Sequence, residues 1–492
     1  MKRILTVFIA LALIGIHSPA FAGGWDGSGW ENPKWSDGAW AGEATTNLSV
    51  AKSIPGLTFF ADYAEDTLTA GYASGSDVAT FAASRSASNP ATYIDADGVL
   101  QLTTTSNVGR FTKGYYDTTG FHSREGVLIE GAATNYLTDT MFGRAIGADN
   151  WDSSYGTITD TSSTIINISG AKERKVEYIY LGSEANFTDF LTQLTPNDSF
   201  DASGANVIGT VSFWARGDIS GITTGTSTTT FLNISENDNA ASFQRTALTK
   251  TLAEAASFLS VTEWRRFSFP FTVTDTDTRK VRVSFISLTT TNKPTASENA
   301  SLEITGVQVE VTPYATSFIP TTAAALTRNL EILKGENDDN RTAATEAMVC
   351  KLTPEFPHSS GVNHYMTSTD TKLRAFWFGT SNDVYHRPNA TDSSDCFLTD
   401  IINGSWAAYT QMTLGFNDQT GVTPYAAGFY QGVADGTNDS TDDFTANAWG
   451  TYFYVGSSNS SNNQLGGIIQ WIGFWNRPLT ATEHLKIYTD MD

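Results

Sequence analysis

The segment from residue 302 to 311 constrains the fold of this chain more than any other part of the sequence. Its apolar and polar residues alternate with a period of two, and the alternation breaks once, at Gly306. Such a period predicts a β-strand with one buried face and one wet face, and an isolated glycine within it predicts a bulge. The predicted buried face comprises Leu302, Ile304, Val307, Val309 and Val311, and the predicted wet face comprises Glu303, Thr305, Gln308 and Glu310.

Similar runs fill residues 150–320 at a spacing of about ten residues, with turn residues between them, as is typical of a β-sandwich. Two examples are VSFWAR at 211–216 and WRRFSF at 264–269. One stretch, 252–259, favours a short helix, and we expect it to cap the strands around it.

The first 22 residues have the three parts of an export signal. Lys2 and Arg3 supply positive charge, residues 4–16 are apolar, and Ala20-Phe21-Ala22 is a small-residue cleavage site. The apolar run is shorter than the roughly 20 residues that span a bilayer, so we expect cleavage; an uncleaved anchor is the alternative. The mature protein should then be soluble and either secreted or periplasmic.

The charge of the mature chain is strongly negative. Without Lys2 and Arg3 it has 28 basic and 52 acidic residues, a net charge of −24. Such a surface repels phosphate backbones and anionic headgroups, which argues against nucleic acid and membrane surfaces as partners.

Residues 23–53 differ from the rest of the chain. Trp25, Trp30, Trp35 and Trp40 recur at every fifth position among Gly, Ser, Asp and Asn. This period suits neither a helix nor a strand, so we expect an irregular leader. The indole rings could stack on sugars, or they could fill grooves on the neighbouring sandwich. We prefer the second interpretation, because an exposed Trp is costly in water.

A turn is predicted at Asp95-Ala96-Asp97-Gly98, between the short runs 92–94 and 99–100. Asp and Gly tolerate the positive φ that a tight hairpin needs. A DxDG run can also open a calcium loop, but the other ligands of such a loop, including its distal Glu, are missing here. We therefore predict a hairpin.

Several motifs recur in order along residues 78–137 and 211–321. They include ATYIDADGVL at 91–100, GVLIEGAATNYL at 126–137 and ATSFIPT at 315–321. Together they resemble motifs of phage tail-fibre and secreted proteins with a carbohydrate-binding-module-like jelly roll. The resemblance implies that fold, with Arg110 and Glu130 as scaffold residues that could pair. Phe318 stands where the family usually has Tyr, which removes one hydroxyl.

Residues 323–492 carry a second series of motifs. Trp406 opens a strand, FYQGV and YFYVG follow at 429–433 and 452–456, and GIIQWIGFWNRPLTATE occupies 467–483. These motifs resemble a laminin-G-like, concanavalin-A-type jelly roll. Thr480 and Glu483 also form a capping box, which predicts the start of a short C-terminal helix.

The predicted fold class is therefore all-β, with two antiparallel jelly-roll β-sandwiches in tandem behind an irregular Trp-rich N-terminal segment. The predicted parts are a signal peptide (1–22), a Trp/Gly-rich leader (23–53), a hairpin-rich segment (54–137), a carbohydrate-binding-module-like sandwich (138–322) and a laminin-G-like jelly roll (323–492).

Concanavalin-type folds host both glycosidases and lectins, and the spacing of carboxylates distinguishes the two. Retaining glycosidases of this type carry paired carboxylates about 5.5 Å apart, at alternate positions of one strand. Residues 323–492 contain no such ExDxxE spacing. Their acidic clusters, at 336–339 and 439–443, lie in stretches typical of solvated turns. The sequence therefore favours a protein that is not an enzyme.

One acidic loop could bind calcium. Asp and Asn oxygens are the ligands that Ca²⁺ prefers, but their spacing alone does not bring them together, so a solvated loop is the alternative. No other cofactor is indicated. The candidate ligands are Asp435, Asn438, Asp439 and Asp442.

The chain has two cysteines, Cys350 and Cys396. In an oxidising compartment they could form a disulfide worth about 3–4 kcal/mol in the chain-entropy model. Two separate buried thiols are the alternative, and the disulfide is slightly favoured.

Aromatic and amide side chains of the last domain are the candidates for sugar binding. Tyr409 and Gln411 occupy alternate positions to the apolar residues Trp406, Met412 and Leu414. If the apolar residues face the core, Tyr409 and Gln411 should face the opposite surface. The alternative is that the aromatic residues pack under loops. The predicted ligand-binding residues are Trp377, Tyr385, Arg387, Tyr409 and Gln411.

These observations predict a secreted, non-enzymatic adhesin or substrate-binding protein that binds a glycan or cell-surface polysaccharide on preformed faces. We expect no nucleic acid and no membrane insertion, and a homo-oligomer is left open. The resemblances imply one alternative, a structural or receptor-binding component of a phage-like particle or extracellular fibre. A glycoside hydrolase is the third.

Overall fold

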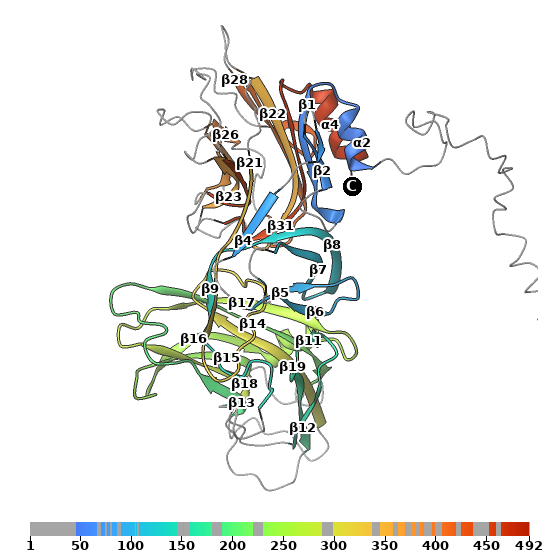
Figure 1. The fold of residues 1–492 in the computed structure, drawn as a ribbon. Helices are drawn as coiled ribbons and strands as arrows, with labels where there is room; N and C mark the ends of the chain where they lie inside the picture. The colour runs from blue at the N-terminus through green and yellow to red at the C-terminus, as the bar shows by residue number, and fades with distance from the viewer. Residues whose placement is uncertain are drawn as a thin grey trace, which may run out of the picture. The chain divides into compact units, whose positions relative to one another are not determined.

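The computed structural model describes residues 46–65, 70–73, 76–78, 81–85, 90–103, 105, 108–144, 151, 157–179, 189–219, 230–287, 299–336, 345–357, 363–369, 375–379, 384–387, 396–398, 406–419, 425–435, 452–458 and 464–491. Residues 47–492 form one compact unit. It is built mostly from antiparallel β-strands, which confirms the all-β prediction (Figure 1). The export signal and the four leader tryptophans lie outside the described residues.

Two of the sheets combine strands from residues 57–129 with strands from 331–475, and we call this pair the split sandwich. The larger sheet has the order β29 (Val433–Asp435), β28 (Tyr425–Tyr430), β27 (Met412–Gln419), β22 (Thr345–Pro354), β31 (Gly467–Trp475), β1 (Leu57–Asp62), β2 (Ala70–Ala73), β3 (Ser76–Val78). Two further strands branch from this path: β8 (Gly120–Ile129) pairs with β31, and β7 (Arg110–Asp117) pairs with β8. The smaller sheet has the order β26 (Cys396–Leu398), β25 (Val384–Arg387), β24 (Ala375–Phe378), β23 (His364–Thr369), β30 (Tyr452–Val455), β21 (Glu331–Glu336), β4 (Phe81–Arg85).

The core of the split sandwich lies between these two sheets. Phe59, Met348 and Phe474 from the larger sheet pack in one cluster with Leu333 and Val455 from the smaller sheet. Burial of each such side chain contributes roughly 1.5–3 kcal/mol.

This shared core corrects the predicted domain boundaries. Segments 54–137 and 323–492 are not separate parts, because β1 and β8 pair with β31, and β4 pairs with β21. The chain leaves the split sandwich after β8 and returns to it at β21.

Two helices cover the outer face of the larger sheet (Figure 1). They are α2 (Asn47–Lys52) and α4 (Ala481–Asp490). Thr480 and Glu483 form the predicted capping box at the start of α4. The prediction of an irregular leader is wrong over Asn47–Lys52, because apolar α2 side chains find partners on this face. That cluster includes Val50, Ala51, Ile54, Val349, Trp471, Trp475, Ile487 and Met491.

A second pair of sheets, which we call the inserted sandwich, spans residues 157–310. The five-stranded sheet has the order β10 (Thr157–Ser162), β12 (Lys172–Ile179), β19 (Asn299–Glu310), β14 (Val207–Asp218), β17 (Arg265–Val273). The four-stranded sheet has the order β13 (Asp189–Leu194), β18 (Lys280–Ser287), β15 (Thr230–Asn237), β16 (Phe243–Thr251).

Aromatic rings fill the core between these two sheets. Phe213 of β14 contacts Phe285 of β18 edge-on, with ring centroids 4.9 Å apart, and stacks on Phe267 of β17 at 5.4 Å. Helix α3 (Leu252–Phe258) forms where the sequence predicts it, directly after β16. The sandwich prediction for this region is therefore confirmed, while jelly-roll connectivity stays a prediction.

Strand β19 matches its predicted bulge but not its predicted wet face. Ser212 pairs with Gln308 and Trp214 with Thr305, so β19 has one extra residue there, beside Gly306 at φ 60°. Its polar face is buried rather than wet: Thr305, Gln308 and Glu310 are each 0% exposed.

The reason is that residues 316–319 fold back over this polar face. Thr316 donates two hydrogen bonds to Glu310, and the Ile319 N–H donates to Gln308 Oε1 at 2.7 Å. Val311, predicted to be buried, lies past the end of the strand and is 40% exposed.

The predicted hairpin at 95–98 is confirmed. The Asp95 carboxylate accepts hydrogen bonds from the Asp97 and Val99 N–H groups, and Gly98 has φ 77°. The hairpin belongs to a three-stranded sheet, and two further short strands pair in a sheet of their own. These strands are β5 (Ala91–Ile94), β6 (Leu100–Thr103) and β11 (Ile166–Asn167), and β9 (Ala133–Asn135) with β20 (Leu326–Arg328).

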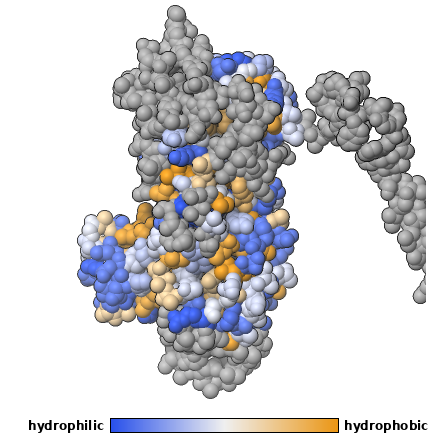
Figure 2. Space-filling model, in the orientation of Figure 1, coloured by the Kyte–Doolittle hydropathy of each residue, from blue (hydrophilic) through white to orange (hydrophobic). Residues whose placement is uncertain are grey.

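The predicted disulfide is not present. Cys350 is a free cysteine, 2% exposed in the core of the split sandwich, whereas Cys396 lies on the edge strand of the opposite sheet. Within the described residues no helix has the length and apolarity to cross a bilayer. On the face drawn in Figure 2, apolar residues form small patches with polar residues between them.

Candidate functional site

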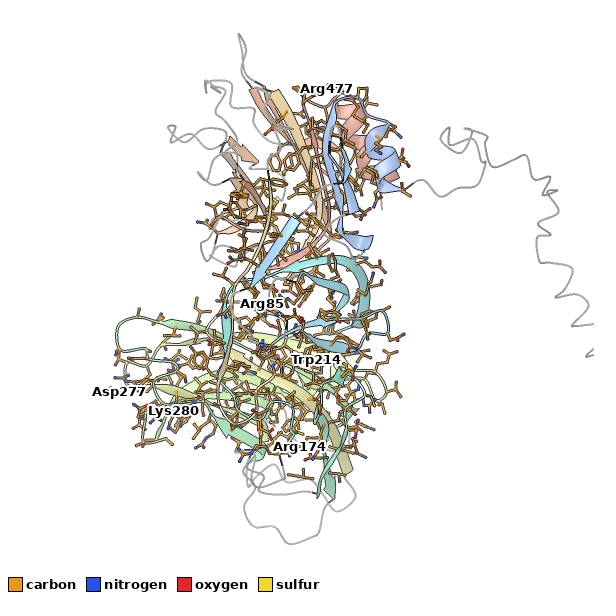
Figure 3. The ribbon with its side chains drawn as sticks, viewed as in Figure 1. Arg85, Arg174, Trp214, Asp277, Lys280 and Arg477 are labelled. Atoms are coloured by element: carbon orange, nitrogen blue, oxygen red, sulfur yellow. The ribbon has the colours of Figure 1, made fainter. Side chains whose placement is uncertain are left out.

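A buried cluster of charged side chains joins the two sandwiches. Arg110, 1% exposed, uses all its N–H groups: its guanidinium binds the Glu331 carboxylate, the Glu130 carboxylate at 2.5 Å, the Ser317 hydroxyl and the Thr92 carbonyl. The pairing of Arg110 with Glu130 is therefore observed. The labelled Arg85 lies in the same junction (Figure 3).

Two carboxyl groups of this junction are shifted in opposite directions. Burial alone would raise the pKa of Glu130, but the charges of Arg328 and Arg110 outweigh it and hold that pKa well below its usual value. Burial, together with the adjacent charge of Glu130, raises the pKa of Glu355 well above its usual value. Of the two carboxyl groups, Glu355 is therefore the one that holds a proton more readily.

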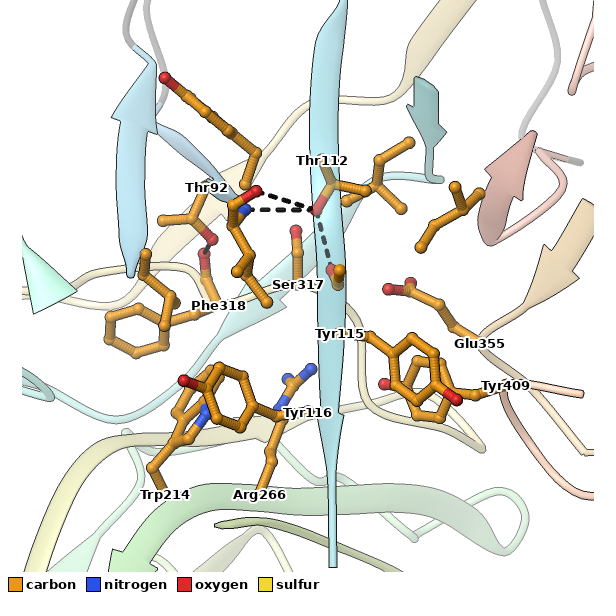
Figure 4. Close-up of a pocket in the computed structure, with 16 residues that line it drawn as sticks. Thr92, Thr112, Tyr115, Tyr116, Trp214, Arg266, Ser317, Phe318, Glu355 and Tyr409 are labelled. Carbon is orange, nitrogen blue, oxygen red and sulfur yellow. Dashed lines mark hydrogen bonds between the residues drawn. The ribbon is translucent and has the colours of Figure 1, made fainter. Parts of the chain in front are cut away.

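A small cavity lies beside these groups (Figure 4). Its volume is about 20 Å³, and its walls include Glu355, Arg266, Trp214, Tyr115 and Tyr409. The ring of Tyr409 stacks on Tyr115 with centroids 4.3 Å apart and 3° between their planes. One water needs about 10–15 Å³ of such space, so this cavity fits a water molecule and not a sugar ring.

A much larger groove lies where the end of α4 meets β22 and β27 on the outer face of the larger sheet. Its volume is about 570 Å³. Met412 and Leu414 of β27 point into the core, so Gln411 and Thr413 lie on the opposite face, as the alternation predicted. We call it the α4 groove; it is lined by Lys351, Gln411, Thr413, Gln431, Tyr488, Thr489, Asp490 and Met491.

A tight turn holds one amide in this groove. Gln431 and Gly432, between β28 and β29, have φ 51° and 76°, and a type I′ turn needs positive φ at both positions. Gly432 has no room for a side chain: a Cβ there would lie 2.8 Å from Leu485 Cα and 2.9 Å from Tyr488 Cβ. The turn therefore packs directly against α4.

Hydrogen bonds fix the amides of the α4 groove. The Gln431 N–H donates to the Thr413 carbonyl at 3.0 Å, and the Gln431 side chain donates to the Gln411 carbonyl at 3.4 Å. The Gln411 amide donates in turn to Gln470 Oε1. Because these contacts hold the side chains before any ligand arrives, little ordering is needed on binding.

The groove also contains one cationic and one anionic side chain. The Lys351 ammonium lies 3.4 Å from the Met491 carbonyl, and Lys351 is 7% exposed. The hydrogen bond from Lys486 lowers the pKa of Asp490, so that carboxylate is ionised at neutral pH. Tyr488, 40% exposed, provides an aromatic ring beside them.

The five predicted ligand-binding residues do not form one described site. Gln411 lies in the α4 groove, and Tyr409 lies in the junction between the sandwiches. The strand pairing sets Trp377 opposite Tyr385, and Arg387 opposite Ala375, while the side chains of these three predicted residues lie outside the described part of the chain.

The predicted calcium site falls mostly outside the description as well. Asp435 ends β29, and Asn438, Asp439 and Asp442 are not among the described residues. In the part of the chain that the structure describes, no group of three or more His, Cys, Asp or Glu side chains is placed to hold a metal ion.

The sequence missed most of the α4 groove. Gln431 belongs to the FYQGV motif, which the sequence analysis used only for the jelly-roll resemblance, and Tyr488 follows the capping box that predicted a short C-terminal helix. A Gln at a turn position that favours Asn or Gly was the available signal, because a residue of this size rarely adopts positive φ.

The comparisons with known proteins concern the fold. No protein-family model matches this chain, and no curated protein matches it. Among solved structures it is similar to Trypanosoma rangeli sialidase in complex with the inhibitor DANA, at 13% identity over 33% of this chain and 27% of the sialidase, with a TM-score of 0.25.

It is also similar to the binding domain of botulinum neurotoxin DC in complex with rat synaptotagmin II, at 9% identity over 33% of this chain and 41% of that one, with a TM-score of 0.26. The receptor-binding domain of the botulinum neurotoxin C/D mosaic serotype matches at 8% identity over 32% of this chain and 40% of that one, with a TM-score of 0.25. The chain thus spans less than half of each structure, and we take no function from these likenesses.

Proposed function

We propose that this protein binds glycans in the α4 groove, without covalent chemistry. The observation that carries the proposal is the groove itself: about 570 Å³ of open space walled by amides held in place, hydroxyls and one exposed aromatic ring. Ligand sites in proteins usually measure about 300–1,000 Å³, so a saccharide of one or two residues fits the groove.

The lining suits a sugar better than an apolar ligand. Side-chain amides both donate and accept hydrogen bonds, as neighbouring sugar hydroxyls do. Gln411 and Gln431 present two such groups, and Thr413 and Thr489 add hydroxyl groups to the lining. The ring of Tyr488 offers an apolar face for the C–H side of a pyranose.

Two observations support binding without catalysis. Among the described residues that line the α4 groove Asp490 is the one carboxylate, whereas glycoside hydrolysis generally needs two. The carboxyl groups that do converge, Glu130, Glu331 and Glu355, lie in the buried junction, where Arg110 binds the first two and a cavity of water size adjoins the third.

We place this activity outside the cytoplasm, since residues 1–22 have the form of an export signal. The partner is then a free polysaccharide or a glycan on a cell surface. Calcium bound by the predicted ligands Asp435, Asn438, Asp439 and Asp442 remains part of the proposal, and a chelator tests it.

The test is a glycan array with the protein from residue 23 onward, followed by calorimetry on the glycans that bind. Gln431→Gly removes the amide and relieves the positive φ, so it should weaken binding about tenfold while the fold stays intact. Tyr488→Ala should also weaken binding, by about tenfold or more, because stacking is lost.

Matched controls lie on the inserted sandwich. Gln244→Ala and Phe243→Ala remove an amide and a ring that is 62% exposed, both away from the α4 groove. Equal losses in the test and control variants, or no glycan bound by the wild type with or without calcium, would refute the proposal. Release of reducing ends from a bound glycan would show an enzyme instead.

A further inference from the structure

A second open groove lies where the three-stranded sheet of β5, β6 and β11 meets the inserted sandwich, and it shares no residue with the α4 groove. Its volume is about 490 Å³. We call it the β11 groove, and its lining is Val99, Gln101, Ser162, Ser163, Thr164, Ile166, Asn167, Ile168, Gly170 and Ala171. None of these ten side chains is charged.

A parallel strand pair builds this groove. β11 pairs with β6 in parallel register, Ile166 with Leu100 and Asn167 with Gln101. Because parallel partners are joined by long connections, residues distant in sequence meet here. The Ile166 side chain, 2% exposed, anchors the pair in the core, and Asn167 remains on the surface.

A relay of hydrogen bonds orients the two amides of the groove. The Gln101 amide donates to the Asp95 carboxylate at 2.5 Å, and the Asn167 amide donates to Gln101 Oε1 at 2.8 Å. These two bonds fix both amide planes. The Asn167 oxygen and the Ser162 hydroxyl have no partner among the described residues, so both can bind a ligand.

The opposite wall is held by a buried carboxylate. Glu173, 2% exposed, accepts hydrogen bonds from the Thr164 N–H and from the Thr164 hydroxyl, the latter at 2.7 Å. Arg216 lies 3.6 Å from the same carboxylate. The charge of Glu173 is therefore engaged beneath the wall, and the groove presents neutral groups to solvent.

We infer that the β11 groove is a second saccharide site, selective for neutral sugars. The inference rests on the proposed function only in the class of ligand, since the two grooves share no residue. A neutral wall of fixed amides and hydroxyls, with the aliphatic Val99 and Ile168 beside them, matches a ligand that offers hydroxyls and C–H groups but no charge.

The two sites should respond differently to salt. Binding in the β11 groove should change less than about twofold between 50 and 500 mM NaCl, because no charged side chain lines it. The α4 groove contains Lys351 and Asp490, so a charged sugar there should bind in a salt-dependent way.

The experiment counts bound ligands by native mass spectrometry and measures affinities by calorimetry. The probes are neutral hexasaccharides of glucose, mannose, galactose, xylose and N-acetylglucosamine. Asn167→Ala tests the β11 groove, Gln431→Gly tests the α4 groove, and Gln244→Ala is the control for both. Circular dichroism and thermal melts of each variant confirm that it is folded.

We expect two ligands on the wild type and one on each groove variant, with affinity at the altered groove about tenfold weaker. One ligand lost only in Gln431→Gly would overturn the second site and leave the proposed function standing. One ligand lost only in Asn167→Ala would overturn the proposed α4 groove site and leave the β11 groove site standing. No ligand on any variant overturns both, and a tenfold loss in salt at the β11 groove overturns its neutral character.

Discussion

Protonation of a buried histidine, His484, should lower the stability of this protein at mildly acidic pH. His484 of α4 is 1% exposed, and its ring stacks on Phe429 with centroids 3.6 Å apart. Asn417 donates to the Leu479 carbonyl, so its Oδ1 is the acceptor for His484 Nε2, which lies 3.1 Å away and carries the proton. The other ring nitrogen faces the backbone of Gly415.

The magnitude follows from the shift in pKa. Burial lowers the pKa of His484 from 6.5 to about 3, against a smaller raising effect from Glu483. The unfolded chain therefore takes up this proton first. The stabilisation is complete above pH 6.5 and is lost as the pH falls, at about 1.4 kcal/mol per unit. At pH 5 about 2 kcal/mol should be gone.

Other groups titrate in the same range, so a variant must isolate His484. Burial also lowers the pKa of His364, to about 4, which adds a loss of the same sign. Burial raises the pKa of Glu310 and Glu355, which acts in the opposite direction. His484→Phe keeps the stacking on Phe429 and leaves those three groups unchanged.

The assay is urea unfolding of the wild type and His484→Phe at pH 7, 6 and 5, followed by tryptophan fluorescence. The free energy of unfolding of the wild type should fall by about 2 kcal/mol more than that of the variant between pH 7 and 5. Parallel pH dependence of the two proteins would refute the reasoning, because His484 would then be protonated equally in both states.

Three further predictions follow from the same structure. Arg110→Ala should lower the free energy of unfolding by about 3–5 kcal/mol, because Glu130 and Glu331 would stay buried without their partner. The control Arg144→Ala, at an exposed position, should change it by less than about 0.5 kcal/mol. Urea titration measures both values, and equal effects would contradict the junction as described. Gly432→Ala should destabilise the protein by more than about 1 kcal/mol and weaken glycan binding, because positive φ and the contact with Leu485 both oppose a Cβ. An unchanged melting temperature would contradict this prediction. Cys350 should resist thiol reagents in the folded protein and react once the protein is unfolded, because burial raises its pKa to about 12. Rapid labelling of the native protein, or a disulfide found by mass spectrometry, would contradict a free, buried thiol.

The sequence predicted local structure well because local structure depends on neighbours in the chain. The period of two in β19, the turn at 95–98 and the capping box at Thr480 each rest on residues within a few positions of one another. Steric and hydrogen-bonding rules act directly at that range.

Pairing between distant strands could not be read in the same way. β1 lies beside β31 with Phe60 opposite Gly473, and nothing in either short run identifies the other. Both are apolar strands that would fit many neighbours. The choice is made by the packing of the whole core, so the sequence placed a boundary where the structure has one shared sheet.

A fold-back of the chain directly after β19 explains why the polar residues of this strand were misjudged. Gln308 and Glu310 alternate with apolar residues and therefore predicted a wet face. That face is covered by residues 316–319, six to eleven positions further along, and these residues supply hydrogen-bond partners for Gln308 and Glu310. The candidate site shows the converse, since Gln411 was placed on the correct face but its neighbours in the groove, Gln431 and Tyr488, come from other elements.

The buried charges suggest why the chain can be interrupted within one sandwich. The split sandwich is left after β8 and re-entered at β21, and Glu130 and Glu331 are the residues at these two crossings. Arg110 binds both, so a single guanidinium fixes the exit and the return of the chain. Apolar contacts alone would tolerate a shift between the two strands, whereas a buried Arg left unpaired would cost several kcal/mol. We therefore expect Arg110→Met, which preserves much of the volume, to cost less stability than Arg110→Ala but to broaden the unfolding transition, because the register at the crossing would no longer be specified. A transition as sharp as that of the wild type would show that packing alone sets this register.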